Sequence, residues 1–160
     1  MNYDVQPDFI VGPNSELSKK KNDVWVAQCL RVDVPNSNKR VYPRHVIEAA
    51  INKLTDSINQ RGLMGELDQP LDSIIHHANT SHLITALKLN GEYLEAEIEI
   101  LYTPRGLILK EMLDKYSSKI AFRPRGIGNG KVDEHGMFIV GDSYKLVTID
   151  AVESQEASTL

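Results

Sequence analysis

The sequence predicts an α+β fold, a small and mainly antiparallel β-sheet or β-barrel flanked by helices. Short stretches that alternate apolar and polar residues outnumber the two stretches with the 3.6-residue spacing of a helix. The 160 residues are 41% hydrophobic and 25% charged, which is the composition of a globular protein with one core. We therefore expect a single domain over residues 23–152, between a flexible arm at 1–22 and a frayed tail at 153–160.

The first half of the domain changes from strand spacing to helix spacing. Residues 24–34 alternate apolar and polar side chains up to a proline, which predicts a strand followed by a turn at 36–38. From Pro43 the spacing becomes helical, and a proline suits the first turn of a helix. Residues 61–81 combine glycines, a proline and polar groups, which predicts a long irregular segment. Loops of this length often carry function.

The second half is predicted to begin with a β-hairpin. Residues 83–89 and 93–101 flank a turn at 90–92, and glutamates occupy one face of the second strand. Thr103 before Pro104 predicts the start of a second helix, which should end near Ser117 and Ser118. The remaining predicted elements are, in chain order, a strand at 119–123, a glycine-rich turn at 126–130, a hairpin through 135–136 and a strand at 146–152.

Composition and charge argue against several classes of protein. No apolar run exceeds five residues, far fewer than the roughly 20 that a membrane helix needs. Met1–Asp4 lacks the basic and apolar segments that begin a signal peptide, so neither secretion nor membrane insertion is expected. Cys29 is the only cysteine and cannot form an internal disulfide. We expect it to be a buried core residue in a reducing compartment.

Acidic and basic residues are segregated along the chain, whose net charge is −4. Residues 66–99 hold seven acids and one base, whereas residues 105–131 hold seven bases and two acids. The two stretches could face each other within the fold or between subunits, or the basic one could attract an anionic partner. Nucleic-acid binding is not expected, because no aromatic residues are interleaved with the bases as in a stacking surface.

Two local patterns suggest ligand sites, but neither fits well. Gly126, Gly128 and Gly130 resemble a phosphate-binding loop, yet no helix follows to supply a positive N-terminus. A histidine group near Asp72 has spacings that match no common zinc pattern. Its members are His76, His77 and His82. The sequence therefore predicts neither a cofactor nor a metal ion.

Four groups of residues, taken in order, resemble the prohead protease family of tailed bacteriophages. They are Asn36–Pro43, Gly65–Pro70, Ser81–Ile84 and Ile120–Gly128. Residues 145–152 also resemble the last core strand of that family, so the resemblance covers most of residues 24–152. It implies a herpesvirus-assemblin-like serine protease fold. It also implies a role in the immature phage head, where the family cuts scaffold and capsid-protein propeptides.

The sequence departs from this family at the two catalytic positions. The family motif usually reads Gly-Glu-Leu-x-His-Pro, and the position of its histidine, the general base, holds Gln69 here. The family usually has two serines before Arg-Gly, the first being the nucleophile, and here that pair is Arg123–Pro124. A neutral amide and a guanidinium cannot accept a proton at neutral pH. The substitutions therefore predict a catalytically inactive domain.

Several neighbours of the lost pair are retained, namely Glu66, His82, Arg125 and Gly126. In the family, the Arg-Gly pair helps to shape the oxyanion site. Arg123 and Arg125 are predicted to bind a carboxylate or an acidic segment of a partner, since a guanidinium can hold a carboxylate with two hydrogen bonds. His82 is expected to be a hydrogen-bonded structural residue.

The predicted partners are phage structural proteins, from the capsid, the scaffold, the neck or the tail. A homo-oligomer is compatible with the sequence, and the expected location is the virion or the assembling particle in the bacterial cytoplasm. The alternative is an active serine protease with relocated catalytic residues. Ser117 or Ser118 would then be the nucleophile, and His76, His77 or His82 the base. Only this alternative predicts labelling by a serine-reactive phosphonate.

Overall fold

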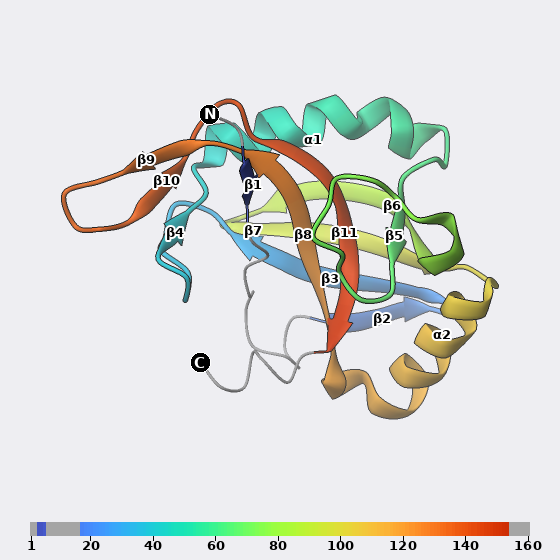
Figure 1. Cartoon of the computed structure of the whole chain (residues 1–160). Coiled ribbons are helices and arrows are strands. Elements are labelled where there is room, and N and C mark those ends of the chain that lie inside the picture. The colour runs from blue at the N-terminus through green and yellow to red at the C-terminus, as the bar shows by residue number, and fades with distance from the viewer. Residues whose placement is uncertain (1–2, 6–16, 154–160) are drawn as a thin grey trace.

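A computed structural model describes residues 3–5 and 17–153 of the chain (Figure 1). Two α-helices and three mostly antiparallel sheets confirm the predicted α+β class. The described strands form separate open sheets, so the closed barrel allowed by the prediction is absent from this part of the chain. The largest sheet contains, in spatial order, β2 (Leu17–Lys21), β3 (Val24–Arg31), β7 (Tyr93–Ile100), β6 (Thr80–Asn90) and β5 (Met64–Glu66).

The predicted hairpin forms the centre of this five-stranded sheet. β6 and β7 pair antiparallel, and Gly91 in the turn between them has a φ of 62°, which glycine adopts without strain. Along β7, Leu94, Ala96 and Ile98 are buried, whereas the alternating glutamates are partly exposed. The two-residue periodicity of the sequence therefore translates directly into a core face and a solvent face.

Two three-stranded sheets complete the strand content. One contains β1 (Tyr3–Val5), β8 (Ile120–Gly128) and β11 (Lys145–Glu153), and the other contains β4 (Arg40–Val41), β10 (Phe138–Val140) and β9 (Gly130–Val132). The predicted glycine-rich turn is wrong, because Gly126 and Gly128 lie within β8. A Cβ on Gly126 would lie 2.5 Å from the Tyr144 ring, so this glycine allows a close packing contact.

Both predicted helices are present. α1 (Arg44–Asn59) buries Val46, Ile47 and Ala50, and Pro43 precedes its first residue as an extended cap. α2 (Pro104–Tyr116) begins as predicted, because the Thr103 hydroxyl accepts a hydrogen bond of 3.0 Å from the Gly106 amide. Short 3-10 turns, η1 (His77–Asn79) and η2 (Ser117–Lys119), precede β6 and β8. Neither α-helix in the described ranges has the length and hydropathy of a membrane span.

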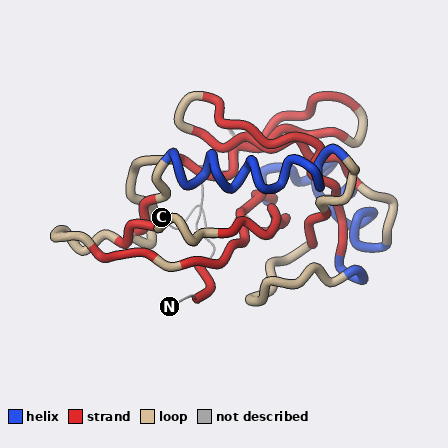
Figure 2. Tube along the Cα trace, turned by 90° about the horizontal axis from the view of Figure 1, so that it is seen from above, coloured by secondary structure: helices blue, strands red, loops and turns tan. Residues whose placement is uncertain are grey.

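The core fills the space between the five-stranded sheet, the β8–β11 pair and α1. In Figure 1, β8 and β11 cross in front of the large sheet while α1 lies along its upper side, and Figure 2 shows the same arrangement from above. Trp25, Ile84, Ile47, Phe122 and Ile149 are buried in one cluster. β11 also contacts the segment after β5, because the Asp68 amide donates to the Ala151 carbonyl oxygen at 2.8 Å. This contact places residues 67–79 beside β8 and β11.

Several predictions concern the ends of the chain and its cysteine. Parts of the segment predicted as a flexible arm form β1 and β2, while residues 1–2 and 6–16 lie outside the described residues. Residues 154–160 of the predicted tail also lie outside them. Cys29 is buried, as predicted, and burial raises the pKa of its thiol.

Candidate functional site

The structure brings together the two segments at which the sequence departs from the family. The Gln69 side-chain amide donates hydrogen bonds to the backbone oxygens of Arg123 (3.3 Å) and Pro124 (3.1 Å). Gln69 follows β5 and the acceptors lie in β8, so only the tertiary fold makes them neighbours. The positions expected to hold the base and the nucleophile are therefore adjacent, and they are joined by an amide and two carbonyl groups.

A buried ion-pair cluster of Arg125, Glu66 and Asp150 lies next to this contact. Arg125 Nε and Nη2 donate to the two carboxylate oxygens of Asp150 at 2.9 and 3.2 Å, and Nη2 also donates to Glu66 Oε2 at 2.8 Å. The three side chains are 5%, 1% and 0% exposed, in the order Arg125, Glu66, Asp150. Such charge-assisted, two-bond contacts are strong and geometrically specific.

The same arginine also fixes the loop after β5. Arg125 Nη1 donates to the backbone oxygens of Asp72 (3.1 Å) and Ile74 (2.9 Å), and the His76 amide donates to Glu66 Oε2 (3.1 Å). A guanidinium has five N–H donors, and all five have acceptors within the chain here. Arg125 thus connects β5, β8, β11 and the 67–79 loop.

The binding role predicted for Arg123 and Arg125 stays a prediction. Arg125 could bind a ligand carboxylate only by exchanging one of its internal hydrogen bonds for the new one. Arg123 is 9% exposed and interacts with other groups of the chain. Both arginines are therefore held in place before any partner binds.

His82, the third retained neighbour, lies on β6 and is fully buried. Its Nε2 lies 2.7 Å from the Ile149 carbonyl oxygen, which can only accept, so Nε2 carries the proton. The Ser81 hydroxyl then donates to Nδ1 at 2.8 Å, and the ring packs edge-on against Phe122. Burial lowers the pKa of His82 to about 4, so the ring is neutral. This geometry is that of a structural histidine joining β6 to β11.

Among the side chains that the structure describes, which do not include that of Ser118, the relocated-protease alternative has no catalytic Ser–His pair. Ser117 lies in η2, and no hydrogen bond joins it to a described histidine. His76 pairs with Asp72 at 2.8 Å, while His77 is exposed in η1. A serine nucleophile needs its base within hydrogen-bond reach.

Other ligand chemistry has little support in the described part of the chain. No group of three or more His, Cys, Asp or Glu side chains there could hold a metal ion. Gly130 opens β9, where a Cβ would lie 2.0 Å from the Ile139 carbonyl oxygen. The glycines thus allow strands to approach closely, and no helix N-terminus follows them to bind a phosphate.

Asp150 is the site residue that the sequence analysis missed. Burial raises its pKa to about 6, although Arg125 favours the ionised form and opposes this shift. Thr148, on the same strand, is also buried and donates to the Met64 carbonyl oxygen at 2.8 Å. The sequence does contain an indication of this site, because Thr148 and Asp150 are polar residues within an otherwise apolar strand. The partner of Asp150, however, lies on another strand and has no local sequence pattern.

Replacing Asp150 with asparagine should make stability depend more steeply on pH between about 6 and 4. The raised pKa of Asp150 means that the native state gains stability as the pH falls through this window. The lowered pKa of His82 means that the native state loses stability over nearly the same window. Asp150→Asn removes the first effect and leaves the second. As the pH falls from about 6 to 4, the free energy of unfolding of the variant should therefore decrease by up to about 1.4 kcal/mol per pH unit relative to that of the unmodified chain.

Urea denaturation of both proteins at several pH values measures this difference. Carboxylates outside the Arg125 cluster have the same surroundings in both proteins, so their effects cancel when one curve is subtracted from the other. Parallel curves for the two proteins would contradict the proposed titration of Asp150.

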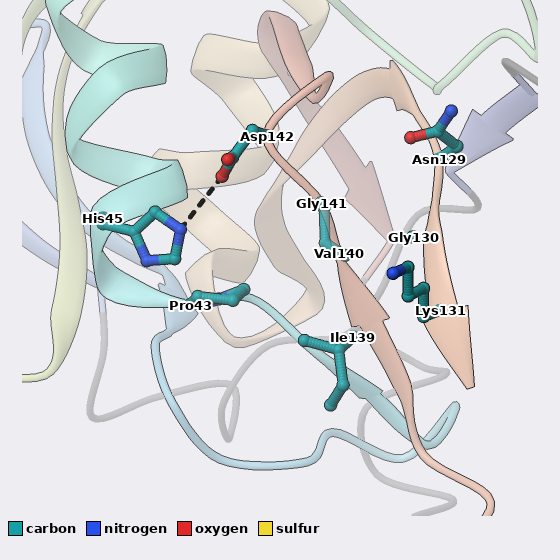
Figure 3. A pocket seen from close by; sticks show the side chains of 9 residues that line it. All are labelled: Pro43, His45, Asn129, Gly130, Lys131, Ile139, Val140, Gly141 and Asp142. Carbon is teal, nitrogen blue, oxygen red and sulfur yellow. Dashed lines mark hydrogen bonds and ion pairs between the residues drawn. The ribbon is translucent and has the colours of Figure 1, made fainter. Parts of the chain in front are cut away.

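A separate cleft of about 830 Å³ lies between the start of α1 and the β9–β10 hairpin (Figure 3). Pro43 and Ile139 line it, and His45 pairs with Asp142 at its margin, with 3.0 Å between Nε2 and Oδ1. Neither Gln69 nor the Arg123–Pro124 segment is among its lining residues. The cleft is therefore distinct from the site formed by the two motifs.

Comparisons with known proteins found a family model and a solved structure similar to this chain. Residues 15–159 match the model of a family described as prohead core protein serine protease. A structure of the bacteriophage T4 capsid assembly protease, gp21, has the same fold, with a TM-score of 0.73 and 19% sequence identity. The similarity covers 95% of this chain and 96% of that one. No curated protein matches the chain. Since the family model spans most of the sequence, this chain belongs to the prohead core protein serine protease family.

Proposed function

We propose that this chain is a catalytically silent member of its family that serves as a structural or interaction component during phage head assembly. One observation carries the proposal: the Gln69 amide bonds the backbone of Arg123 and Pro124, where the family would have its base and nucleophile. Neither Gln69 nor Arg123 can take up or release a proton near neutral pH in a Ser–His mechanism. Removing such a pair typically removes most of the catalysis.

The backbone around position 124 supports the same conclusion. An oxyanion site needs N–H donors aimed at the developing negative charge. Pro124 has no N–H, and the oxygens of Arg123 and Pro124 are already bonded to Gln69. Pro124 therefore removes one possible N–H donor beside the Arg125–Gly126 pair, which the family resemblance places at the oxyanion site.

A binding role would explain why the chain has the family fold but lacks the catalytic residues. The Arg125 cluster holds the 67–79 loop in a defined shape beside β8 and β11. Prearranged surfaces bind at a lower entropic cost than flexible ones. Family membership favours capsid or scaffold proteins as partners, in the virion or in a particle assembling within the host cell. Neck and tail proteins are alternative partners.

The purified chain should show no adduct by intact mass after incubation with a fluorophosphonate probe. It should also leave the scaffold and capsid proteins of its own particle uncut, and it should co-purify with an unprocessed structural protein. Trypsin serves as the positive control for the probe. A serine adduct or new cleavage products would contradict the proposal and would direct mutagenesis to Ser117 and Ser118.

A matched variant combines Gln69→His, Arg123→Ser and Pro124→Ser, which restores the residue types of the family motif. We expect any probe labelling of this variant to be at position 123. Equal labelling of the unmodified chain would instead support a relocated nucleophile.

A further inference from the structure

The cleft between the start of α1 and the β9–β10 hairpin has the size and the lining of a site for a small molecule (Figure 3). Its volume of about 830 Å³ lies within the range of small-molecule sites, about 300–1,000 Å³. Its lining comes from three separate parts of the chain, namely the start of α1, residues 129–131 and residues 139–142. Sites of this kind are mostly apolar and carry a few polar groups that orient the ligand.

The floor of the cleft is apolar. Ile139 lies in the middle of β10, and Pro43 directly precedes α1. Both side chains are half-buried and lie between the helix and the hairpin in Figure 3. Gly130 and Gly141 also line the cleft and have no side chain to fill it. An apolar group could therefore rest on this floor.

Lys131 places a positive charge on one wall of the cleft. It is the cross-strand neighbour of Ile139, so the two side chains lie on the same face of the hairpin. Lys131 is exposed and forms no ion pair with a carboxylate in the described part of the chain. Other lysines do have carboxylate partners, namely Lys20, Lys88, Lys110 and Lys115. The Lys131 ammonium can therefore bind an anion without giving up a partner among the described residues.

Asn129 adds a second hydrogen-bond donor to the same wall. Its Oδ1 accepts from the Ser143 hydroxyl, and its backbone amide donates to Ser143 Oγ at 3.0 Å. The Asn129 Nδ2 group has no acceptor among the residues that the structure describes. The wall thus offers an ammonium and an amide donor. A carboxylate suits both, because it accepts at two oxygens and bonds most strongly to charged donors.

The opposite margin of the cleft is closed to a long ligand. His45 and Asp142 pair across it, with 3.0 Å between Nε2 and Oδ1 (Figure 3). This pair connects α1 to the loop after β10, and Asp142 supplies the only carboxylate among the described lining residues. A polypeptide running through the cleft would have to break the pair, whereas a small molecule would not. The shape of the cleft therefore favours a compact ligand.

We propose that this cleft is a binding site for a small organic acid with an apolar body and one carboxylate. The carboxylate accepts hydrogen bonds from Lys131 Nζ and Asn129 Nδ2. The apolar body packs on Ile139 and Pro43. The inference does not depend on the proposed loss of catalysis or on a partner protein, because the positions of the family's base and nucleophile do not line the cleft.

Titration of the isotope-labelled full chain with phenylbutyrate, monitored by NMR, tests the site. This probe has an aromatic body and one carboxylate, and a probe of its size should bind with a Kd on the order of 1 mM. Saturable shifts should be confined to the amides of residues 44–45, 129–131 and 139–142. Shifts that do not saturate, or that saturate only elsewhere, would overturn the proposal.

Two analogues test the role of the carboxylate. Phenylbutanol and phenylbutylamine have the same body as the probe and lack its carboxylate. Each should bind at least about tenfold more weakly, because neither gives Lys131 an anionic partner. Equal affinities of the alcohol and the acid would show that the cleft recognises only apolar surface, which would contradict the proposed class of ligand.

The charge of the wall is tested by Lys131→Glu, which should retain the fold because Lys131 is exposed. The variant should bind phenylbutyrate at least about tenfold more weakly, and phenylbutylamine more tightly, than the unmodified chain does. Lys53→Glu makes the same change at an exposed position of α1 and should leave both affinities unchanged. Equal effects of the two substitutions would mean that net charge governs binding, and the proposed site would be wrong.

A peptide probe distinguishes a free acid from an acidic segment of a protein. The capped peptide acetyl-Gly-Phe-Asp-Gly-amide carries the same two groups on a polypeptide backbone. It should bind more weakly than phenylbutyrate, because its backbone meets the margin closed by His45 and Asp142. Tighter binding of the peptide would overturn the assignment to a small molecule and would make the cleft a docking site for a partner protein.

Discussion

Replacing Arg125 with alanine should lower the free energy of unfolding by about 3–5 kcal/mol. The guanidinium is the cation of a buried cluster, and its loss leaves the carboxylates of Glu66 and Asp150 without their charged partner. It also removes the hydrogen bonds to the backbone oxygens of Asp72 and Ile74, so Gln69 alone of these contacts still attaches the 67–79 loop to β8. Chemical denaturation monitored by circular dichroism measures the change.

Arg31→Ala is the matched control, because Arg31 forms an exposed ion pair with Glu92. Exposed pairs contribute about 0–1 kcal/mol, so this variant should be nearly as stable as the unmodified chain. If Arg125→Ala does not fold, Arg125→Lys retains the charge without the fork of donors and should show an intermediate loss. Similar stabilities for the Arg125 variants and Arg31→Ala would show that the buried cluster is not a stabilising element.

Replacing Gly65 with alanine should destabilise the fold by about 3 kcal/mol or more. A Cβ at this position would lie 2.1 Å from Nε2 of His82 and 2.2 Å from the Ile149 carbonyl oxygen. Both the ring and the β11 backbone must therefore move, and the buried hydrogen bond between His82 and Ile149 would be lost. Thermal and urea denaturation should both detect the loss.

Gly62→Ala provides the control for this substitution. Gly62 lies three residues earlier, and a Cβ there would meet only the Ser57 carbonyl oxygen at an ordinary 3.5 Å. Adding His82→Ala to Gly65→Ala should restore only part of the stability, because the Ile149 oxygen still lies close to the new methyl group. Equal stability of the two single alanine variants would contradict the packing argument.

These contacts give a structural reason for each retained motif residue. Gly65 makes room for His82, and Glu66 is the partner of Arg125. Gly126 makes room for Tyr144. Each residue has a packing or pairing role that does not require catalysis. The family-like motifs around Gln69 and Arg123 are therefore compatible with a domain that keeps the family fold and lacks its chemistry.

Local sequence patterns predicted those helices and strands whose contacts join residues that are close together in the sequence. The β6–β7 hairpin and both helices follow from apolar spacing, a glycine turn and the Thr103–Pro104 start signal. The prediction failed for residues 126–130, where glycines indicated a turn. The three glycines lie instead in β8 and β9, where side chains and strands from other parts of the fold approach them closely.

The identity of residues 69 and 123 is enough to say which chemistry these positions can support, since the proton affinity of an amide or a guanidinium is a property of the group itself. The groups that surround Gln69 and Arg123, in contrast, follow from the folding of distant segments against each other. The Gln69 contacts span 54 and 55 residues, and Arg125 joins partners 25 and 59 residues away. No periodicity encodes such pairings. They arise when β5, β8 and β11 pack together and each buried polar group must find a partner that replaces water.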